Sequence, residues 1–238
     1  YGVDEITGLI DYSALMAQAK LVQPKMIIAG ASAYPRSIDW SLFREIADSV
    51  GAMLLVDMAH YSGLIAGGVF PSPIHYADVV TSTTHKTLRG PRGGIILWNN
   101  PDYSKRINSA IFPGTQGGPL MHIIAAKAQC FIEANTQEFK DYSQAVVQNA
   151  KAMCRVFLEN GLEVQTNGTD SHIILMDLSA SKHSGRQAAD LLEANGITVN
   201  KNGVPNDPRS FIETSGIRIG TAAETTRGHD EEWFKELA

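Results

Sequence analysis

The chain has 238 residues, which is enough for one large domain or two small ones with a substantial core. Lysine and arginine number 20 against 25 aspartates and glutamates, a formal net charge of -5. This balance gives no basic field to attract a polyanion, so we predict that the chain binds neither nucleic acid nor a membrane surface.

The ends of the chain and its cysteines carry further information. No stretch is apolar enough to span a bilayer, and the chain begins at Tyr1 without an initiator methionine or a signal peptide. Cys130 and Cys154 lie in segments with helical patterns, which favours buried thiols in a reducing compartment over a disulfide. We therefore predict a cytoplasmic location. Because the chain ends inside an apparent helix, Asp230 to Ala238, we expect a piece of a longer protein.

Helical and strand patterns alternate in the first part of the chain. Ile10 to Val22 has apolar residues at helical spacing, with Ser13 as the expected N-cap. Lys25 to Gly30 is a short apolar run, typical of a strand buried on both faces. Asp39 should cap the next helix, and Gly51 stands where a helix C-terminal glycine is common.

Three more apolar runs predict strands, at Met53 to Val56, Val79 to Ser82 and Gly94 to Trp98. Such runs alternating with a capped helix predict an α/β fold with a mostly parallel sheet and helical crossovers. Polar side chains directly follow several of these runs: Ser32, Asp57, His60 and Lys86. If the strands are parallel, these side chains collect at the edge where α/β proteins place their chemistry.

The pattern becomes helical from Pro119, with helices expected over Leu120 to Asn135 and Thr136 to Asn160. The glycine at Gly161 should stop the second helix. These helices resemble a connector, so we predict a boundary near Asn135 that divides the chain into domains of residues 1–135 and 136–238.

The second predicted domain is a smaller α+β unit. Its strands are expected at Ile173 to Leu178, Ile197 to Val199 and Ile217 to Gly220. A helix between the first two should open with a capping box at Ser184 and close at Gly196.

Lys86 is the candidate reactive group of the chain. It follows a β-branched run and precedes the glycine-rich turn of Gly90 to Gly94, which places it where a strand ends and a loop begins. Partial desolvation there favours the neutral amine, the form that attacks a carbonyl to make an imine. The alternative is a surface lysine beside a turn.

Asp57 gives the lysine a chemical context. An imine-forming lysine and an aspartate at the end of a neighbouring strand are the minimum required for pyridoxal phosphate, since the carboxylate keeps the ring nitrogen protonated. Asp57 is alternatively a helix cap or, with His60, a metal ligand; no third ligand of matching spacing is evident, and we predict no metal. His60 either contacts the cofactor ring or is a core residue.

Three further segments have the composition of ligand sites. The glycines of Pro113 to Pro119 suit a phosphate at a helix N-terminus, or form a tight loop. Arg218, in a short strand flanked by glycines, is suited to grip a carboxylate through two parallel hydrogen bonds, or forms an ion pair. Val199 to Pro208 is a polar loop that forms a ligand wall or a surface connection.

Four motifs in order give the chain a close resemblance to the serine hydroxymethyltransferase family of pyridoxal phosphate enzymes, whose fold resembles that of aspartate aminotransferase. They are VDMAH at Val56 to His60, TTHKTLRGPRGG at Thr83 to Gly94, FPGTQGGPLMH at Phe112 to His122, and ITVNKNGVPNDP at Ile197 to Pro208. The resemblance implies that residues 1–135 belong to the large, cofactor-binding domain of fold type I and residues 136–238 to the small domain.

The resemblance also implies roles for individual residues. Lys86 is similar to the lysine that holds pyridoxal 5'-phosphate as an aldimine, and Asp57 to the partner of its pyridine nitrogen. Ser32 and His60 resemble contacts of the ring substituents, and Thr83 and His85 resemble supporting active-site groups. Arg218 resembles the receptor of the amino-acid carboxylate, and Asn202 part of the tetrahydrofolate pocket. Gly117 and Gly118 resemble a loop that reaches the cofactor phosphate of an adjacent subunit, which implies a homodimer with shared active sites.

The family's activity, as the resemblance implies it, is reversible transfer of the serine hydroxymethyl group to tetrahydrofolate, giving glycine and 5,10-methylenetetrahydrofolate. Two alternatives share the lysine and aspartate: a threonine aldolase or an aminotransferase of the same fold. A catalytically inactive fragment is a third, because the family's N-terminal portion would supply a phosphate-binding loop and a ring-stacking residue that are absent here.

Overall fold

The computed structural model describes residues 1–238, which divide into two units. We call them the lysine unit and the arginine unit, after Lys86 and Arg218. The lysine unit comprises Tyr12–Ser32 and Ile38–Lys140. The arginine unit comprises Tyr1–Asp11, Ala33–Ser37 and Asp141–Ala238. The assignment of residues 1–135 and 136–238 to two functional domains stays a prediction.

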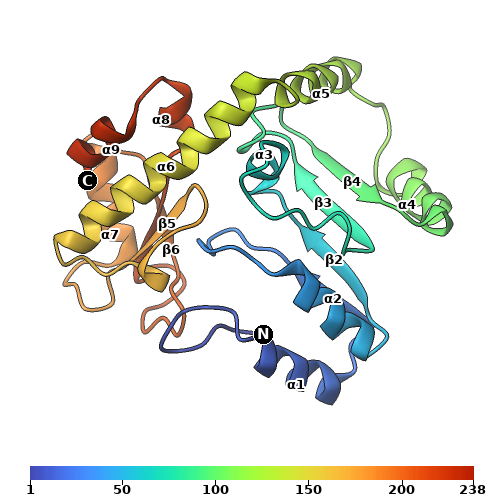
Figure 1. Ribbon diagram of the computed structural model, residues 1–238, viewed down its shortest axis with the longest axis horizontal. Helices are drawn as coiled ribbons and strands as arrows, with labels where there is room; N and C mark the ends of the chain where they lie inside the picture. Colours follow the sequence, from blue (N-terminus) through green and yellow to red (C-terminus); the bar gives the residue numbers. More distant parts are fainter. The chain divides into compact units, whose positions relative to one another are not determined.

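The lysine unit is built on a four-stranded sheet (Figure 1). Its strands, in spatial order, are β1 (Met26–Ala29), β2 (Met53–Asp57), β3 (Val79–Thr83) and β4 (Gly94–Trp98). The first three are parallel, as predicted, whereas β4 runs antiparallel to β3. The prediction of a mostly parallel sheet is confirmed; β4 is antiparallel because the segment between Thr83 and Gly94 is too short for a helical crossover.

Helix α1 (Tyr12–Val22) packs on α2 (Trp40–Ser49), which in turn packs on β1 and β2 (Figure 1). Asp39 is the predicted N-cap of α2, and its carboxylate accepts hydrogen bonds from Ser41 N and Leu42 N. The core beneath α2 is apolar, with the fully buried side chains Trp40, Phe43, Ile46, Leu54 and Val56.

Two predictions in this region are wrong. Ser13 lies inside α1, which begins one residue earlier at Tyr12, so it is not the N-cap. The β1 strand is buried on one face only: Ile27 and Ala29 are buried, whereas Ile28 remains 62% exposed. The reason is that a helix such as α2 covers only one face of a strand.

The remaining regular elements of the lysine unit are helices. The short elements α3 (Ser62–Ala66), η1 (Pro101–Tyr103), α4 (Ser104–Ser109) and η2 (Ala110–Thr115) have too few residues to show a helical period in the sequence. The longer helix α5 (Met121–Ala134) confirms the helix predicted over Leu120 to Asn135.

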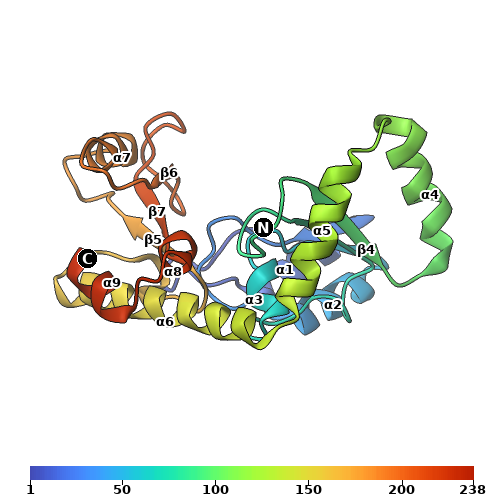
Figure 2. The ribbon, with the colours of Figure 1, turned by 90° about the horizontal axis from the view of Figure 1, so that it is seen from above.

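The arginine unit contains a three-stranded antiparallel sheet in the order β5 (Ile173–Asp177), β7 (Gly216–Gly220) and β6 (Asn200–Asn202). Its helices are α6 (Gln137–Glu159), which begins at the end of the lysine unit, η3 (Gln165–Asn167), α7 (Gly185–Ala194), α8 (Ala222–Thr226) and α9 (Glu231–Leu237). Figure 2 shows α9 lying alongside α6. Buried residues of α6, β5, β7 and α9 form one core: Met153, Cys154, Phe157, Ile174, Met176, Ile217 and Phe234.

The predicted capping box of α7 is present, because Ser184 accepts a hydrogen bond from Gln187 N and the Gln187 side chain accepts one from Ser184 N. The strand predicted at Ile197 to Val199 is wrong by three residues, since β6 spans Asn200–Asn202. Ile197 N donates to Leu192 O and so completes the end of α7 instead of pairing in the sheet.

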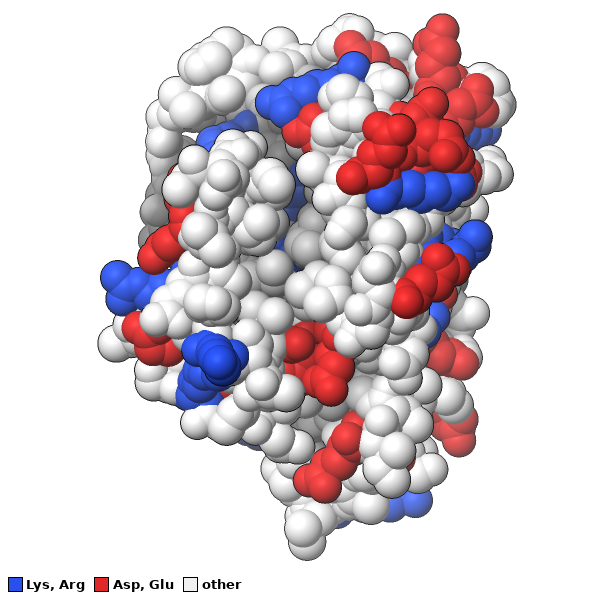
Figure 3. All heavy atoms as spheres, turned by 90° about the vertical axis from the view of Figure 1, so that its left-hand side faces the viewer, with Lys and Arg blue, Asp and Glu red and all other residues white.

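Helix α9 shows how the surface and core of this unit are separated. Phe234 is 2% exposed in the core, whereas Glu231, Glu232 and Glu236 of the same helix are exposed. Figure 3 shows that Asp and Glu side chains gather on one face of the molecule. Asp230 caps the helix by accepting from Trp233 N at 3.1 Å. None of the helices in either unit combines the length and apolar content needed to cross a membrane.

Candidate active site

The carboxyl ends of β1, β2 and β3 lie at one edge of the parallel part of the sheet, and Ser32, Asp57 and Lys86 stand at or just beyond these ends. The chain leaving β1 passes close to β2, since a Cβ on Gly30 would lie only 2.1 Å from Asp57 O. Gly30 has φ +112°, a conformation that glycine tolerates. The edge therefore brings an amine, a carboxylate and a hydroxyl residue into one region.

The loop that carries Lys86 is tied to the segment that carries His60. The Thr87 hydroxyl donates to His60 O at 2.8 Å and accepts from Gly63 N at 3.0 Å, and Thr87 is 1% exposed. A Cβ on Gly63 would lie 2.1 Å from Thr87 O, so the two backbones touch. Thr87 thus fixes the distance between the lysine loop and α3.

Hydrogen bonds hold the glycine-rich turn that follows Lys86. Thr84 Oγ1 donates to Pro91 O at 2.5 Å, Thr84 N to Gly93 O at 3.0 Å, and Gly90 N to Thr84 O at 2.7 Å. His85 Nδ1 accepts from Gly93 N at 3.5 Å. Sequence reasoning missed the roles of Thr84 and Thr87, since hydroxyl residues in a β-branched run signal only strand propensity.

Asp57 and Thr83 are polar groups at this edge that suit a polar ligand such as pyridoxal phosphate. Asp57 is exposed at the end of β2, and its Oδ1 accepts from Ala59 N at 3.0 Å, which orients the carboxylate. Thr83 Oγ1 is buried without a hydrogen-bond partner in the protein, although buried hydroxyls are nearly always paired. A polar ligand beside Lys86 would supply that partner. No group of three or more His, Cys, Asp or Glu side chains is placed to hold a metal ion.

The arginine unit holds the other two predicted ligand residues. Arg218 pairs with Asn200 across β6 and β7, and its Nη2 donates to Asn200 Oδ1 at 2.9 Å. Asn202 pairs with Gly216 in the same ladder. Because side chains alternate along a strand, Asn202 and Arg218 project from the same face of the sheet. Arg218 and Asn202 thus belong to the arginine unit, whereas the predicted cofactor residues around Lys86 belong to the lysine unit.

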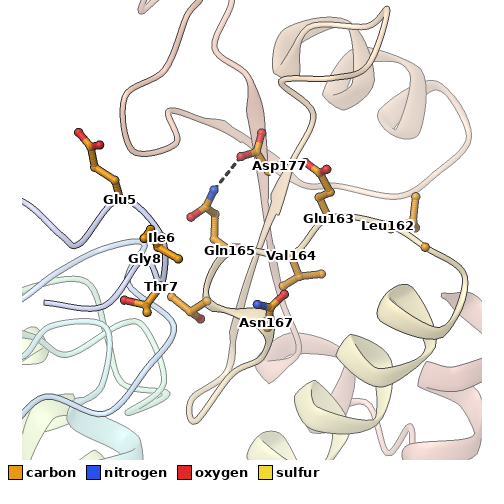
Figure 4. A pocket seen from close by; sticks show the side chains of 12 residues that line it. Glu5, Ile6, Thr7, Gly8, Leu162, Glu163, Val164, Gln165, Asn167 and Asp177 are labelled. Carbon is orange, nitrogen blue, oxygen red and sulfur yellow. Dashed lines mark hydrogen bonds between the residues drawn. The ribbon is translucent and has the colours of Figure 1, made fainter.

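Two hollows lie in the arginine unit. One, of about 310 Å³, is mainly apolar and is bordered by the residues that follow Asn202, with Tyr34, Leu175, Val204 and Pro205 among its lining. The other, of about 390 Å³, is polar and contains no predicted site residue (Figure 4). There Gln165 Nε2 donates to Asp177 Oδ2 at 2.7 Å, as the dashed line in Figure 4 marks.

Gly117 and Gly118 lie in an exposed segment between η2 and α5. A Cβ on Gly118 would meet nothing within 4 Å, and one on Gly117 would meet only the Phe112 ring at 3.9 Å. The contact with a cofactor phosphate assigned to these glycines stays a prediction, as do the individual roles of Ser32, His60 and Asn202.

A lysine and a carboxylate thus stand at the carboxyl ends of neighbouring parallel strands, the edge where α/β proteins place their chemistry. The family model described as serine hydroxymethyltransferase matches residues 1–238, and the chain belongs to that family.

Curated relatives agree with this assignment. The chain is 58% identical over 238 residues to the serine hydroxymethyltransferase of Psychrobacter cryohalolentis and 57% identical to that of Nitrosomonas europaea, and it covers 57% of each. It is 55% identical to serine hydroxymethyltransferase 2 of Rhodopseudomonas palustris, of which it covers 55%. Each match includes 100% of this chain, which spans little more than half the length of these relatives.

Proposed function

We propose that the protein containing this chain transfers the hydroxymethyl group of serine to tetrahydrofolate, reversibly, giving glycine and 5,10-methylenetetrahydrofolate with pyridoxal phosphate as cofactor. The observation that carries the proposal is the position of Lys86 and Asp57 at neighbouring strand ends in a chain of this family. When bound, pyridoxal phosphate supplies an acceptor for the electrons of the bond broken in serine.

The residues of the lysine unit hold and orient the cofactor. Lys86 would provide the amine for its aldehyde, and the hydrogen bond from Thr87 Oγ1 to His60 O fixes the backbone next to this lysine. Asp57, oriented by Ala59 N, would hold a proton at the pyridine nitrogen. Thr83 Oγ1 would donate to a polar group of the ligand and so gain the partner that it lacks within the protein.

The residues of the arginine unit bind the two substrates. Arg218 takes the serine carboxylate through parallel hydrogen bonds, and its side chain is aligned by Asn200 Oδ1. Asn202 contacts tetrahydrofolate from the same face of the sheet, beside the apolar hollow that its loop borders. The whole enzyme is a cytoplasmic homodimer in this proposal, with Gly117 and Gly118 reaching the cofactor phosphate of the partner.

The experiment uses the complete protein, purified with and without added pyridoxal phosphate. We expect visible absorbance from the bound cofactor, and borohydride reduction followed by peptide mapping should place the modification on Lys86. Lys86→Arg should abolish the modification and multiple turnover, whereas Lys25→Arg, an exposed lysine before β1, should retain both.

The activity assay distinguishes the proposed reaction from the related aldolase and aminotransferase reactions. We expect serine cleavage to depend on tetrahydrofolate. Serine cleavage indifferent to tetrahydrofolate, or a cofactor bound to a lysine other than Lys86, would contradict the proposal.

A further inference from the structure

A single carboxylate closes the loop between β6 and β7. Asp207 Oδ2 accepts from Val204 N at 3.2 Å and from Ser215 N at 2.8 Å, and Asp207 Oδ1 accepts from Arg209 N at 2.9 Å. Val204 follows Asn202 closely, and Ser215 precedes Arg218 in the chain. Asp207 therefore joins the segment after one predicted substrate residue to the segment before the other.

Arg209 fastens the same loop to the chain that follows β5. Its Nη1 donates to Leu178 O and to Ser215 Oγ, both at 3.0 Å, and its Nη2 donates to Ser181 O at 2.7 Å. A planar guanidinium satisfies several fixed acceptors at once, which a lysine ammonium does less well. Arg209 thus holds the loop from a second direction.

Packing supports these hydrogen bonds. Val204 is 8% exposed and Ser215 is fully buried. A Cβ on Gly216 would lie 2.7 Å from Val204 Cγ1 and 2.9 Å from Asn202 O, so the loop rests directly on β7. This contact leaves no room for the loop to approach β7 more closely.

The charge of Asp207 suits its three donors. Burial raises the pKa of Asp207, but hydrogen bonds from Ser215, Arg209 and Val204 together outweigh burial and hold the pKa below 3.8. The group is therefore ionised at neutral pH, and an ionised carboxylate accepts hydrogen bonds on both oxygens.

We propose that Asp207 and Arg209 are positioning residues for tetrahydrofolate, because they hold the loop of Asn202 against β7 at the spacing from Arg218 that binding requires. This inference rests on the proposed function. Strand β7 is paired on both sides, with β5 and β6, and keeps Arg218 in place without the loop. Asn202 is the last residue of β6, directly before the loop that Asp207 closes, whereas Arg218 is also paired with Leu175 of β5. Loss of Asp207 therefore loosens Asn202 more than Arg218.

The test measures the KM of each substrate separately in the complete, cofactor-loaded enzyme. Asp207→Ala should raise the KM for tetrahydrofolate by about tenfold to 100-fold, since three backbone hydrogen bonds to a charged group are lost from the loop. The dissociation constant of serine, followed by the cofactor spectrum without folate, should change by less than about threefold.

Asp207→Asn tests the geometry of the carboxylate. Asparagine keeps one acceptor oxygen but turns an NH₂ group toward a backbone donor. The KM of the Asp207→Asn enzyme for tetrahydrofolate should therefore lie between those of the wild type and Asp207→Ala. Arg209→Lys should show the same selectivity for tetrahydrofolate. The control is Asp190→Asn on α7, whose side chain is 71% exposed, and it should match the wild type.

Two results would overturn the positioning role: a KM for tetrahydrofolate within about threefold of wild type in Asp207→Ala, or equal losses for serine and tetrahydrofolate. If Asp207→Ala does not fold, Asp207→Asn and Arg209→Lys decide by the same criteria. A wild-type enzyme without folate-dependent transfer would instead contradict the proposed function, so the two failures are distinguishable.

Discussion

The contact between Gly63 and the Lys86 loop allows a quantitative prediction for Gly63→Ala. The added Cβ would lie 2.1 Å from Thr87 O and 2.2 Å from Thr87 C, whereas ordinary contacts begin at 3.4 Å. Both atoms belong to the backbone, so no side chain can rotate to relieve the overlap. Helix α3 and the lysine loop must separate instead, which breaks the hydrogen bond from Gly63 N to Thr87 Oγ1.

Overpacking commonly costs 1 to 3 kcal/mol, and a clash between backbones lies at the upper end, so we expect a loss of about 3 kcal/mol in the free energy of unfolding. In a chain of this size, this corresponds to a fall in Tm of roughly 6 to 12 °C. Thermal unfolding by calorimetry or circular dichroism measures the change. Affinity for pyridoxal phosphate should fall as well, because the separation moves Lys86 away from His60.

Gly94→Ala, at the start of β4 in the lysine unit, is the matched control. A Cβ there would meet only Ser82 O at 3.5 Å, an ordinary contact, so the free energy of unfolding should stay within about 0.5 kcal/mol of wild type. The reasoning would be refuted if Gly63→Ala unfolded within about 2 °C of wild type, or if both variants lost equal stability.

Three other predictions concern the cofactor partner, a helix cap and the thiols. Asp57→Ala in the complete enzyme should lower turnover by about 10³-fold or more while serine still binds, because the ring loses its proton-holding partner; near-normal steady-state turnover would contradict that role. Asp39→Ala should cost about 1 kcal/mol in the free energy of unfolding, and Asp39→Asn much less. Hydrogen bonds, led by that from Ser41, lower the pKa of Asp39 below 3.8. The stability difference between the wild type and Asp39→Ala should therefore persist above pH 3.8 and disappear as the pH falls through the lowered pKa. Cys130 and Cys154 are buried thiols with pKa values raised by burial, so iodoacetamide should label them only after unfolding, which mass spectrometry detects; rapid labelling of the native protein would show that they are accessible.

Local signals in the sequence predicted most of the helices. The cap at Asp39, the capping box at Ser184 and the glycine after α6 each act through neighbouring residues, and the structure contains all three. The cap assigned to Ser13 failed because a hydroxyl inside the first turn gives the same pattern as one just before it.

Only part of the candidate site is predictable from such local sequence signals. Lys86 and Asp57 are predictable as site residues because polar residues directly after apolar runs signal strand ends. The sequence assigns no separate role to Asp207 within its motif. An aspartate in a turn commonly accepts a hydrogen bond from the backbone N–H two residues on, and Asp207 accepts such a bond from Arg209 N. Its second bond, from Ser215 N, joins residues on opposite sides of the loop and has no local signature.

The sequence by itself therefore determined the family and the elements that short-range interactions form: helices with caps, apolar strands, and four ordered motifs around the lysine. Tertiary structure decided the antiparallel direction of β4, the register of β6 against β7, the contact of Gly63 with Thr87, and the closure of the loop between β6 and β7 by Asp207. The physical reason is that each of these depends on pairing between residues distant in the chain, where burial and hydrogen bonding, and not local propensity, select the arrangement.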